Sequence, residues 1–137
     1  MITSGIATTY RREILDGVHA PNDNYKIALF SASANLGPET TDYTGQPGEV
    51  KGAGYVKGGQ QLRGRTSGIS GKTAYMTFAN PRWSAASFTA RGALIYNASK
   101  NDRAVAVIDF GEDHTCTNGE FAVSLPDAGR NAIVTVA

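Results

Sequence analysis

The chain has 137 residues, of which 41% are hydrophobic and 18% are charged, and its formal net charge is +1. This length fits one domain with its own core, so we expect residues 1–137 to form a single domain. The Lys and Arg residues are scattered rather than gathered in a stripe, which argues against nucleic-acid binding. The sequence has no apolar run of 18 residues, so we expect no membrane span. Its first residues do not show a basic region followed by an apolar core, so we expect no secretion leader.

The charged fraction is low against a typical ~25%, which suggests that partners cover part of the surface. A surface rich in Thr, Ser and Gly is the alternative. Cys116 is the only cysteine, so the chain forms no internal disulfide and fits a reducing compartment. We interpret its thiol as idle rather than catalytic.

The first predicted element is a helix over about residues 8–17. Tyr10, Ile14 and Val18 recur at four-residue spacing and form one apolar stripe, and Gly17 can end the helix. Such a helix either packs on the edge of the fold or grips another subunit.

Five residues are our candidates for contacts with neighbouring subunits. Tyr10, Arg11 and Arg12 belong to the predicted helix, and Tyr55 and Lys57 belong to a glycine-rich stretch further along. We expect residues 1–20 and the glycine-rich stretch to supply most of these contacts. On that view, deleting residues 1–7 or shortening the chain between Gly45 and Gly59 leaves the fold intact.

After a strand predicted over residues 25–32, residues 35–71 hold more than half of the sixteen glycines. Such a stretch cannot bury a continuous apolar face, so we expect a long loop region with short strands at 55–56 and 60–63. A long loop is often functional. It is either an arm that becomes ordered against a partner or a plain hairpin or Ω-loop.

The rest of the chain alternates short apolar runs with polar turns, which is typical of consecutive antiparallel strands. We therefore expect an all-β antiparallel β-sandwich or jelly roll of seven to eight strands with one short N-terminal helix. The remaining predicted strands cover residues 73–78, 82–84, 93–97, 104–110, 120–125 and 132–136.

Two glycine-rich runs resemble nucleotide-binding motifs only in part. Residues 66–73 end in Gly-Lys-Thr, but Thr66 stands where a P-loop has its first glycine, and the next residues predict a strand instead of a helix. The glycines of residues 52–59 lack the strand–turn–helix context of a dinucleotide site. We expect neither motif to bind a nucleotide.

The acidic and histidine residues form no convincing reactive group. Glu112, Asp113 and His114 are consecutive, so their side chains diverge, and we interpret them as a solvated turn rather than a metal site. We expect Asp109 to pair with Arg91 or Arg103. The sequence thus predicts no catalytic residue, no cofactor and no metal, and a hydrolase lacks a credible pair of acids.

Trp83 is the only tryptophan and has two interpretations. With Arg82 and Phe88 it could form a sugar-stacking platform, as in a carbohydrate-binding module. The alternative is a core tryptophan on a strand of the sandwich.

Several runs between residues 25 and 136 resemble small virion proteins of tailed bacteriophages. They are YKIALFSASA, EVKGAGYVKGGQQL, RWSAASFTARGALIYN, AVAVIDFGED and NGEFAVSLP, and the most specific pieces are residues 49–55, 89–93 and 108–111. The resemblance implies a non-enzymatic structural protein of the virion, assembled in the host cytoplasm. A capsid cement or decoration protein is the first reading, and a head–tail connector or a tail or fibre component is the second. The implied partners are the major capsid protein or other virion subunits, with homo-oligomers expected.

Overall fold

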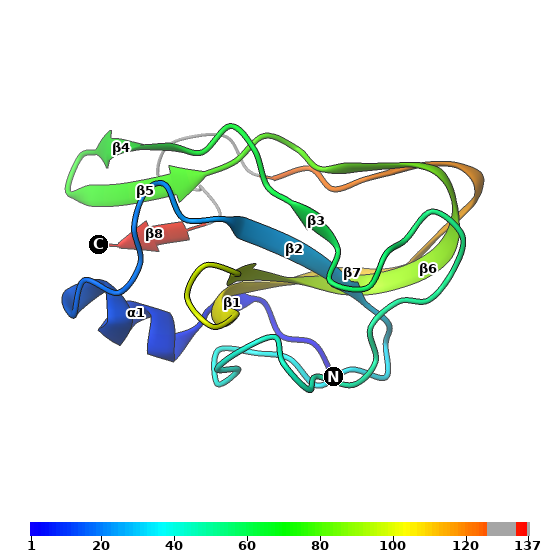
Figure 1. Cartoon of the computed structure of the whole chain (residues 1–137), viewed down its shortest axis with the longest axis horizontal. Helices are drawn as coiled ribbons and strands as arrows, with labels where there is room; N and C mark the ends of the chain where they lie inside the picture. The colour runs from blue at the N-terminus through cyan, green and yellow to red at the C-terminus, as the bar shows by residue number, and fades with distance from the viewer. Residues whose placement is uncertain (126–133, 137) are drawn as a thin grey trace.

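The structure is a computed structural model that describes residues 1–125 and 134–136. Within them the chain is all-β apart from one short helix, as predicted (Figure 1). One antiparallel sheet has the strand order β1-β7-β6-β2-β3 and the other has the order β4-β5-β8. The elements are β1 (Gly5–Ile6), α1 (Thr8–Leu15), β2 (Tyr25–Phe30), β3 (Gln60–Gln61), β4 (Thr66–Ser70), β5 (Thr73–Thr77), β6 (Arg82–Asn97), β7 (Arg103–Ala122) and β8 (Val134–Val136).

The long β6–β7 hairpin dominates the fold. It is paired from Asn97 opposite Arg103 to Arg82 opposite Ala122, and it turns back on itself at the right-hand end of Figure 1. Register shifts interrupt the ladder at the bend, and Ala85 has a positive φ of 49° there. Bulges of this kind let a strand turn a corner without losing its partner. Residues 82–84 and 93–97, which were predicted as two short strands, therefore both belong to the bent strand β6. Residues 104–110 and 120–122 both belong to the bent strand β7, and residues 123–125 of the last predicted strand form none.

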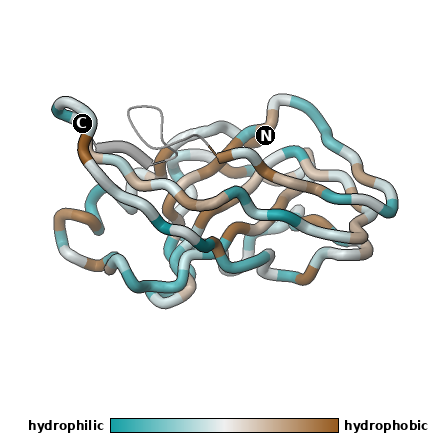
Figure 2. Tube along the Cα trace, turned by 90° about the horizontal axis from the view of Figure 1, so that it is seen from above, coloured by the Kyte–Doolittle hydropathy of each residue, from teal (hydrophilic) through white to brown (hydrophobic). Residues whose placement is uncertain are grey.

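The core centres on β2 and the halves of β6 and β7 next to their connecting turn. Ile27, Leu29 and Leu94 are fully buried, and β2 is apolar on both faces. Tyr43 of the glycine-rich stretch packs on one of these faces, with its ring centroid 6.5 Å from that of Phe30. Residues 48–50 pair with the edge of β2, where the Val50 N–H donates to the Leu29 carbonyl at 2.9 Å. Hydrophobic segments run along the central strands in Figure 2, whereas many outer loops are hydrophilic.

Ile2 and Ala7 belong to this core, which argues against the expectation that residues 1–7 can be deleted without harm to the fold. Ile2 is buried, and its side chain occupies the space that a Cβ on Gly92 would need. Residues Gly5 and Ile6 form β1 and pair with β7, and Ala7 is fully buried.

Helix α1 ends two residues before the predicted boundary because a Schellman motif closes it. Gly17 has a φ of 70°, and its N–H donates to the Ile14 carbonyl at 3.1 Å. The Val18 N–H donates to the Glu13 carbonyl at 3.0 Å. Tyr10 is buried and Ile14 is half-buried, which agrees with a helix packed on the edge of the fold.

The stretch that resembles a P-loop is a β-hairpin. Gly71 and Lys72 form the two-residue turn between β4 and β5, with Gly71 at a φ of 61°. Strand β4 was expected to be loop, and its Gly68 lies against the ring of Tyr75, where a Cβ would clash. Residues 55–56 form no strand, and of 60–63 only Gln60 and Gln61 do. Of the predicted strand 132–136, residues 132 and 133 lie outside the described residues, and 134–136 form β8.

Candidate functional site

Glu49 is the hub of the glycine-rich segment. Its Oε1 accepts a hydrogen bond from the Tyr43 hydroxyl at 2.5 Å. Its Oε2 accepts one from the Tyr55 hydroxyl at 2.6 Å and one from the Gly58 N–H at 2.7 Å. This half-buried side chain therefore connects Tyr43, Tyr55 and Gly58 within residues 35–59. Hydrogen bonds to an ionised carboxylate are about twice as strong as those between neutral groups.

The same hub is tied to the sheet behind it. The Tyr55 hydroxyl also accepts the Leu29 N–H of β2 at 2.9 Å, and the Tyr96 hydroxyl of β6 donates to the Gly58 carbonyl at 2.7 Å. Burial, and then the hydrogen bond to Glu49, raise the pKa of the Tyr43 and Tyr55 phenols well above the usual range. Both phenols therefore stay protonated as donors at neutral pH.

Gly59 lets the segment leave the hub and enter β3. Its φ is 78°, and a Cβ there would stand 1.8 Å from the Ile27 carbonyl oxygen. Only glycine fits this close approach of two backbones.

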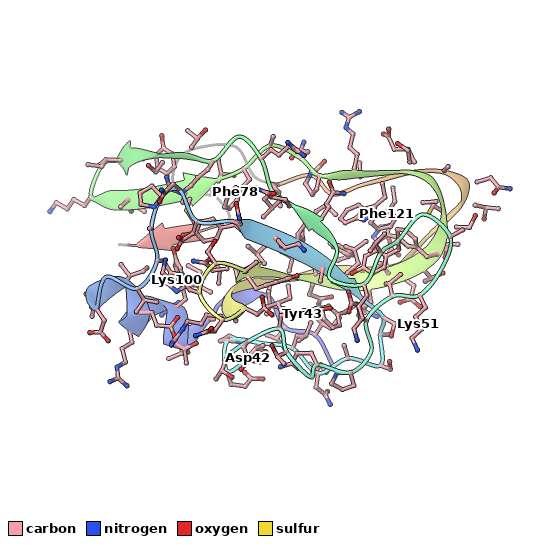
Figure 3. All side chains as sticks on the ribbon, viewed as in Figure 1. Asp42, Tyr43, Lys51, Phe78, Lys100 and Phe121 are labelled. Atoms are coloured by element: carbon pink, nitrogen blue, oxygen red, sulfur yellow. The ribbon has the colours of Figure 1, made fainter. Side chains whose placement is uncertain are left out.

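The outward side of the segment is a surface that we call the 51–57 arc, residues 51–57. Val56 is 74% exposed, and Lys51 and Lys57 are exposed without a carboxylate partner among the described residues. The Ser87 N–H of β6 donates to the Ala53 carbonyl at 2.9 Å and holds the middle of the arc against the sheet. Lys51 lies at the edge of the molecule and Tyr43 nearer its centre in Figure 3.

The five predicted contact residues therefore separate into two groups. Arg11, Arg12 and Lys57 are exposed, with Arg12 3.7 Å from Asp16. Tyr10 is buried, which raises the pKa of its phenol to about 12, and Tyr55 turns its hydroxyl inward to Glu49. Tyr10 is therefore part of the core, whereas half-buried Tyr55 belongs to the 51–57 arc and supports it through its inward hydroxyl.

A second polar cluster anchors α1 to the β6–β7 turn. His19 Nε2 lies 2.8 Å from Glu13 Oε1, and Arg103 donates to Glu13 Oε2 at 2.9 Å. The Asn97 amide nitrogen donates to His19 Nδ1 at 2.9 Å, so Nδ1 accepts and the ring proton sits on Nε2. Asn97 also accepts the Ser99 N–H through its oxygen at 3.0 Å, which fixes the orientation of the amide.

Asp23 completes this second cluster. Lys100 donates to both of its carboxylate oxygens, at 2.8 and 2.7 Å, and Asn97 donates at 2.8 Å. Burial alone would raise the pKa of Asp23, but these bonds and one from the Ala20 N–H outweigh it and lower the pKa to about 2. Both nitrogens of His19 and the carboxylates of Glu13 and Asp23 are thus engaged in internal bonds.

Asp109 pairs with Arg91 at 3.3 Å, one of the two expected partners, while Arg103 binds Glu13. A hydrogen bond from the Gly111 N–H, and then Arg91, lower the pKa of Asp109. Glu112, Asp113 and His114 are exposed as expected, but they lie in β7 and not in a turn. No three His, Cys, Asp or Glu residues in the described part of the chain gather as metal ligands.

Trp83 and Phe88 are 5% and 6% exposed, so the sugar-stacking platform is not present and the core interpretation of the tryptophan is confirmed. Trp83 packs edge-on against Phe121, with ring centroids 6.1 Å apart.

Comparisons with protein-family models, with curated proteins and with solved structures found no match. Among the described residues, no helix is long and apolar enough to cross a membrane.

Proposed function

We propose that this protein is a non-enzymatic structural protein of a tailed-bacteriophage particle, and specifically a cement or decoration protein on the capsid exterior. The observation that carries the proposal is the 51–57 arc, which Glu49 and Tyr55 hold in one conformation before any partner binds. Residues 49–55, one of the runs that resemble phage virion proteins, form most of this arc and its support.

A surface that is ordered within its own chain loses little conformational entropy on docking. Exposed Val56 between Lys51 and Lys57 suits a partner surface with a small apolar site bordered by carboxylates. Many copies on a symmetric particle add avidity to a modest single contact. Of our two alternatives for this stretch, these internal hydrogen bonds favour a plain loop over an arm that becomes ordered only against its partner.

The partners that we propose are the major capsid protein or other virion subunits, together with copies of this chain in a homo-oligomer. Exposed Arg11 and Arg12 on α1 are the second contact region. The location is the virion, after assembly in the host cytoplasm. A head–tail connector or a tail or fibre component is the alternative. We do not propose a carbohydrate-binding module, because Trp83 and Phe88 are buried and cannot stack on a sugar.

The test uses the phage that encodes the protein. The arc variant Lys51→Glu, Val56→Asp, Lys57→Glu is compared with Lys72→Glu, an exposed lysine of the β4–β5 turn. We expect both to fold, with the arc variant at least ~10-fold depleted from purified particles and the control unchanged, since ~1.4 kcal/mol of lost contact is tenfold in affinity. Equal loading of the arc variant would move attachment elsewhere on the surface. Absence of the unaltered protein from purified particles would end the virion proposal, and image reconstruction separates head from tail.

A further inference from the structure

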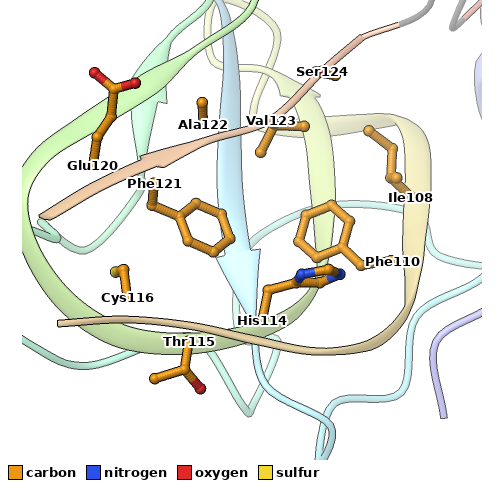
Figure 4. Close-up of a pocket in the computed structure, with 10 residues that line it drawn as sticks. All are labelled: Ile108, Phe110, His114, Thr115, Cys116, Glu120, Phe121, Ala122, Val123 and Ser124. Atoms are coloured by element: carbon orange, nitrogen blue, oxygen red, sulfur yellow. The ribbon is translucent and has the colours of Figure 1, made fainter.

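The bend of β7 creates a pocket that neither polar cluster uses. Residues 108–116 and residues 120–124 face each other as two limbs of the chain, with a space of about 420 Å³ beside them. The rings of Phe110 and Phe121 point into this space, and so does His114 (Figure 4). Ligand pockets in proteins begin at roughly 300 Å³, so this one has room for a single aromatic group.

The floor of the pocket is aromatic and rests on the core. The rings of Phe110 and Phe121 lie 6.3 Å apart, and Phe121 packs on Phe88 at 5.0 Å. Phe110 also meets the His114 ring edge-on at 5.9 Å. Aromatic rings favour such offset and edge-on neighbours, so another ring fits this floor well.

One side of the pocket is an open sheet edge. Strand β1 pairs with β7 only at Ala106 and Val107, and the Asp109 N–H donates to the Ser4 hydroxyl at 2.7 Å. Beyond that point, in the described part of the chain, no strand lies on the outer edge of β7. Free backbone groups at an edge can pair with an added strand.

Acidic residues accompany the pocket along β7, although Glu120 is the one carboxylate in its lining. Of the four carboxylates on this half of β7, Asp109 pairs with Arg91 at 3.3 Å, and Glu120 lies 3.7 Å from Arg82. Glu112 and Asp113 are exposed and have no basic partner among the described residues. A cationic group next to the incoming aromatic ring would find these two charges unpaired.

We infer that the β7 pocket binds an extended segment of a partner protein, with an aromatic side chain in the pocket and a Lys or Arg two residues away. The segment runs along the free edge of β7, where side chains two apart share a face. The exposed carboxylates of Glu112 and Asp113 attract the basic residue through the negative charge of this stretch of β7, although neither lines the pocket, and Phe110 and Phe121 receive the ring. This inference is independent of the 51–57 arc and of the particle to which the protein belongs.

The probe is the blocked pentapeptide acetyl-Lys-Thr-Phe-Thr-Lys-amide, titrated into the intact protein to about 5 mM, the range of weak binding. Trp83, the only tryptophan, lies 6.1 Å from Phe121, and Cys116, the only cysteine, lines the pocket. We expect a saturable change in tryptophan fluorescence and, at saturation, a slowing of Cys116 alkylation of at least ~3-fold. Peptides with Phe replaced by Ala, or with both Lys replaced by Glu, should produce neither effect.

The test variant carries both Glu112→Lys and Asp113→Lys. The control variant carries both Asp16→Lys and Glu39→Lys, which change the net charge by the same amount at other exposed positions. We expect the first pair to weaken binding by at least ~5-fold, about 1 kcal/mol, and the second pair to leave it unchanged. Equal binding of the pentapeptide and its Ala version, equal binding by both variants, or no binding at all would overturn the inference. The inference would also be overturned if the protein self-associates and its Cys116 resists alkylation without peptide, because a second copy of the chain would then fill the pocket.

Discussion

Tyr43 and Tyr96 stack with ring centroids 4.5 Å apart and ring planes 9° apart. Tyr43 belongs to the glycine-rich segment, and Tyr96 belongs to β6 in the central sheet. This pair, together with the hydrogen bonds to Glu49, turns a stretch without regular secondary structure into a fixed layer over the sheet. Order in residues 35–59 thus comes from contacts between distant parts of the chain and not from local propensity.

Replacing Glu49 with Gln should loosen that layer. The Gln amide has only one acceptor oxygen, and its other end carries N–H groups. These N–H groups would face either the Tyr43 hydroxyl or the Tyr55 hydroxyl and Gly58 N–H, which now donate to Glu49, so at least one of these donors loses its acceptor. We expect a loss of about 1–3 kcal/mol in the free energy of unfolding, measured in urea, and faster proteolysis within residues 42–57. The control Glu39→Gln, at an exposed carboxylate, should stay within about 0.5 kcal/mol. Equal effects of both substitutions would show that Glu49 is no hub.

Alkaline pH should unfold the protein through its buried phenols. The pKa values of Tyr43, Tyr55 and Tyr96 are raised, with burial the first cause in each, and that of Tyr10 is raised to about 12. A raised folded-state pKa gives stability that is complete below the unfolded value of about 10 and is lost as the pH rises above it. Phenolate absorbance should therefore rise together with unfolding, followed by Trp83 fluorescence. Ionisation of most tyrosines in the folded protein well before unfolding would contradict this.

The elements that local pattern determines were predictable, and those that tertiary contacts determine were not. The apolar run at residues 25–30 and the helix with its closing Gly17 could be recognised from local sequence alone. Strand β4 was missed because Gly68 in a polar run argues against a strand, and only the ring of Tyr75 beside it explains the glycine. The continuity of β6 was missed because its bulges resemble strand ends. No spacing signals Glu49, since its partners are fixed by the path of the loop.

Acid should weaken the second cluster through Asp23. Its pKa is lowered to about 2, so its stabilising contribution is complete above the unfolded value of about 3.9 and is lost as the pH falls through about 2. Asp23→Asn should remove that part of the acid dependence and lower stability at neutral pH by about 1–3 kcal/mol, because Lys100 loses its partner. Urea unfolding between about pH 2 and pH 7 measures both effects. The same acid slope in the variant and the unaltered protein would assign the dependence to other carboxylates.

Two glycines with nearly the same positive φ should respond differently to alanine. Gly45 and Gly59 have φ values of 76° and 78°, but a Cβ meets nothing within 4 Å at Gly45 and stands 1.8 Å from the Ile27 oxygen at Gly59. We expect Gly45→Ala to cost about 1 kcal/mol from conformational strain alone. Gly59→Ala should cost at least about 3 kcal/mol or prevent folding, because two backbones must separate. Denaturation midpoints of the two variants give the comparison, and similar values would mean that the close approach is not maintained in solution.

The N-terminal segment should behave as core. Ile2 is buried against Gly92 and is joined to Leu36 by a parallel bridge, so Ile2→Ala leaves a cavity between the segment and β6. We expect a loss of about 2–4 kcal/mol in the free energy of unfolding. The neighbouring Thr3 is exposed, and Thr3→Ala should change stability by less than about 0.5 kcal/mol. Removing residues 1–7 should do more than Ile2→Ala, since β1 and buried Ala7 leave with them and β7 gains a free edge. A deletion variant as stable as the intact chain would place the segment outside the folding unit.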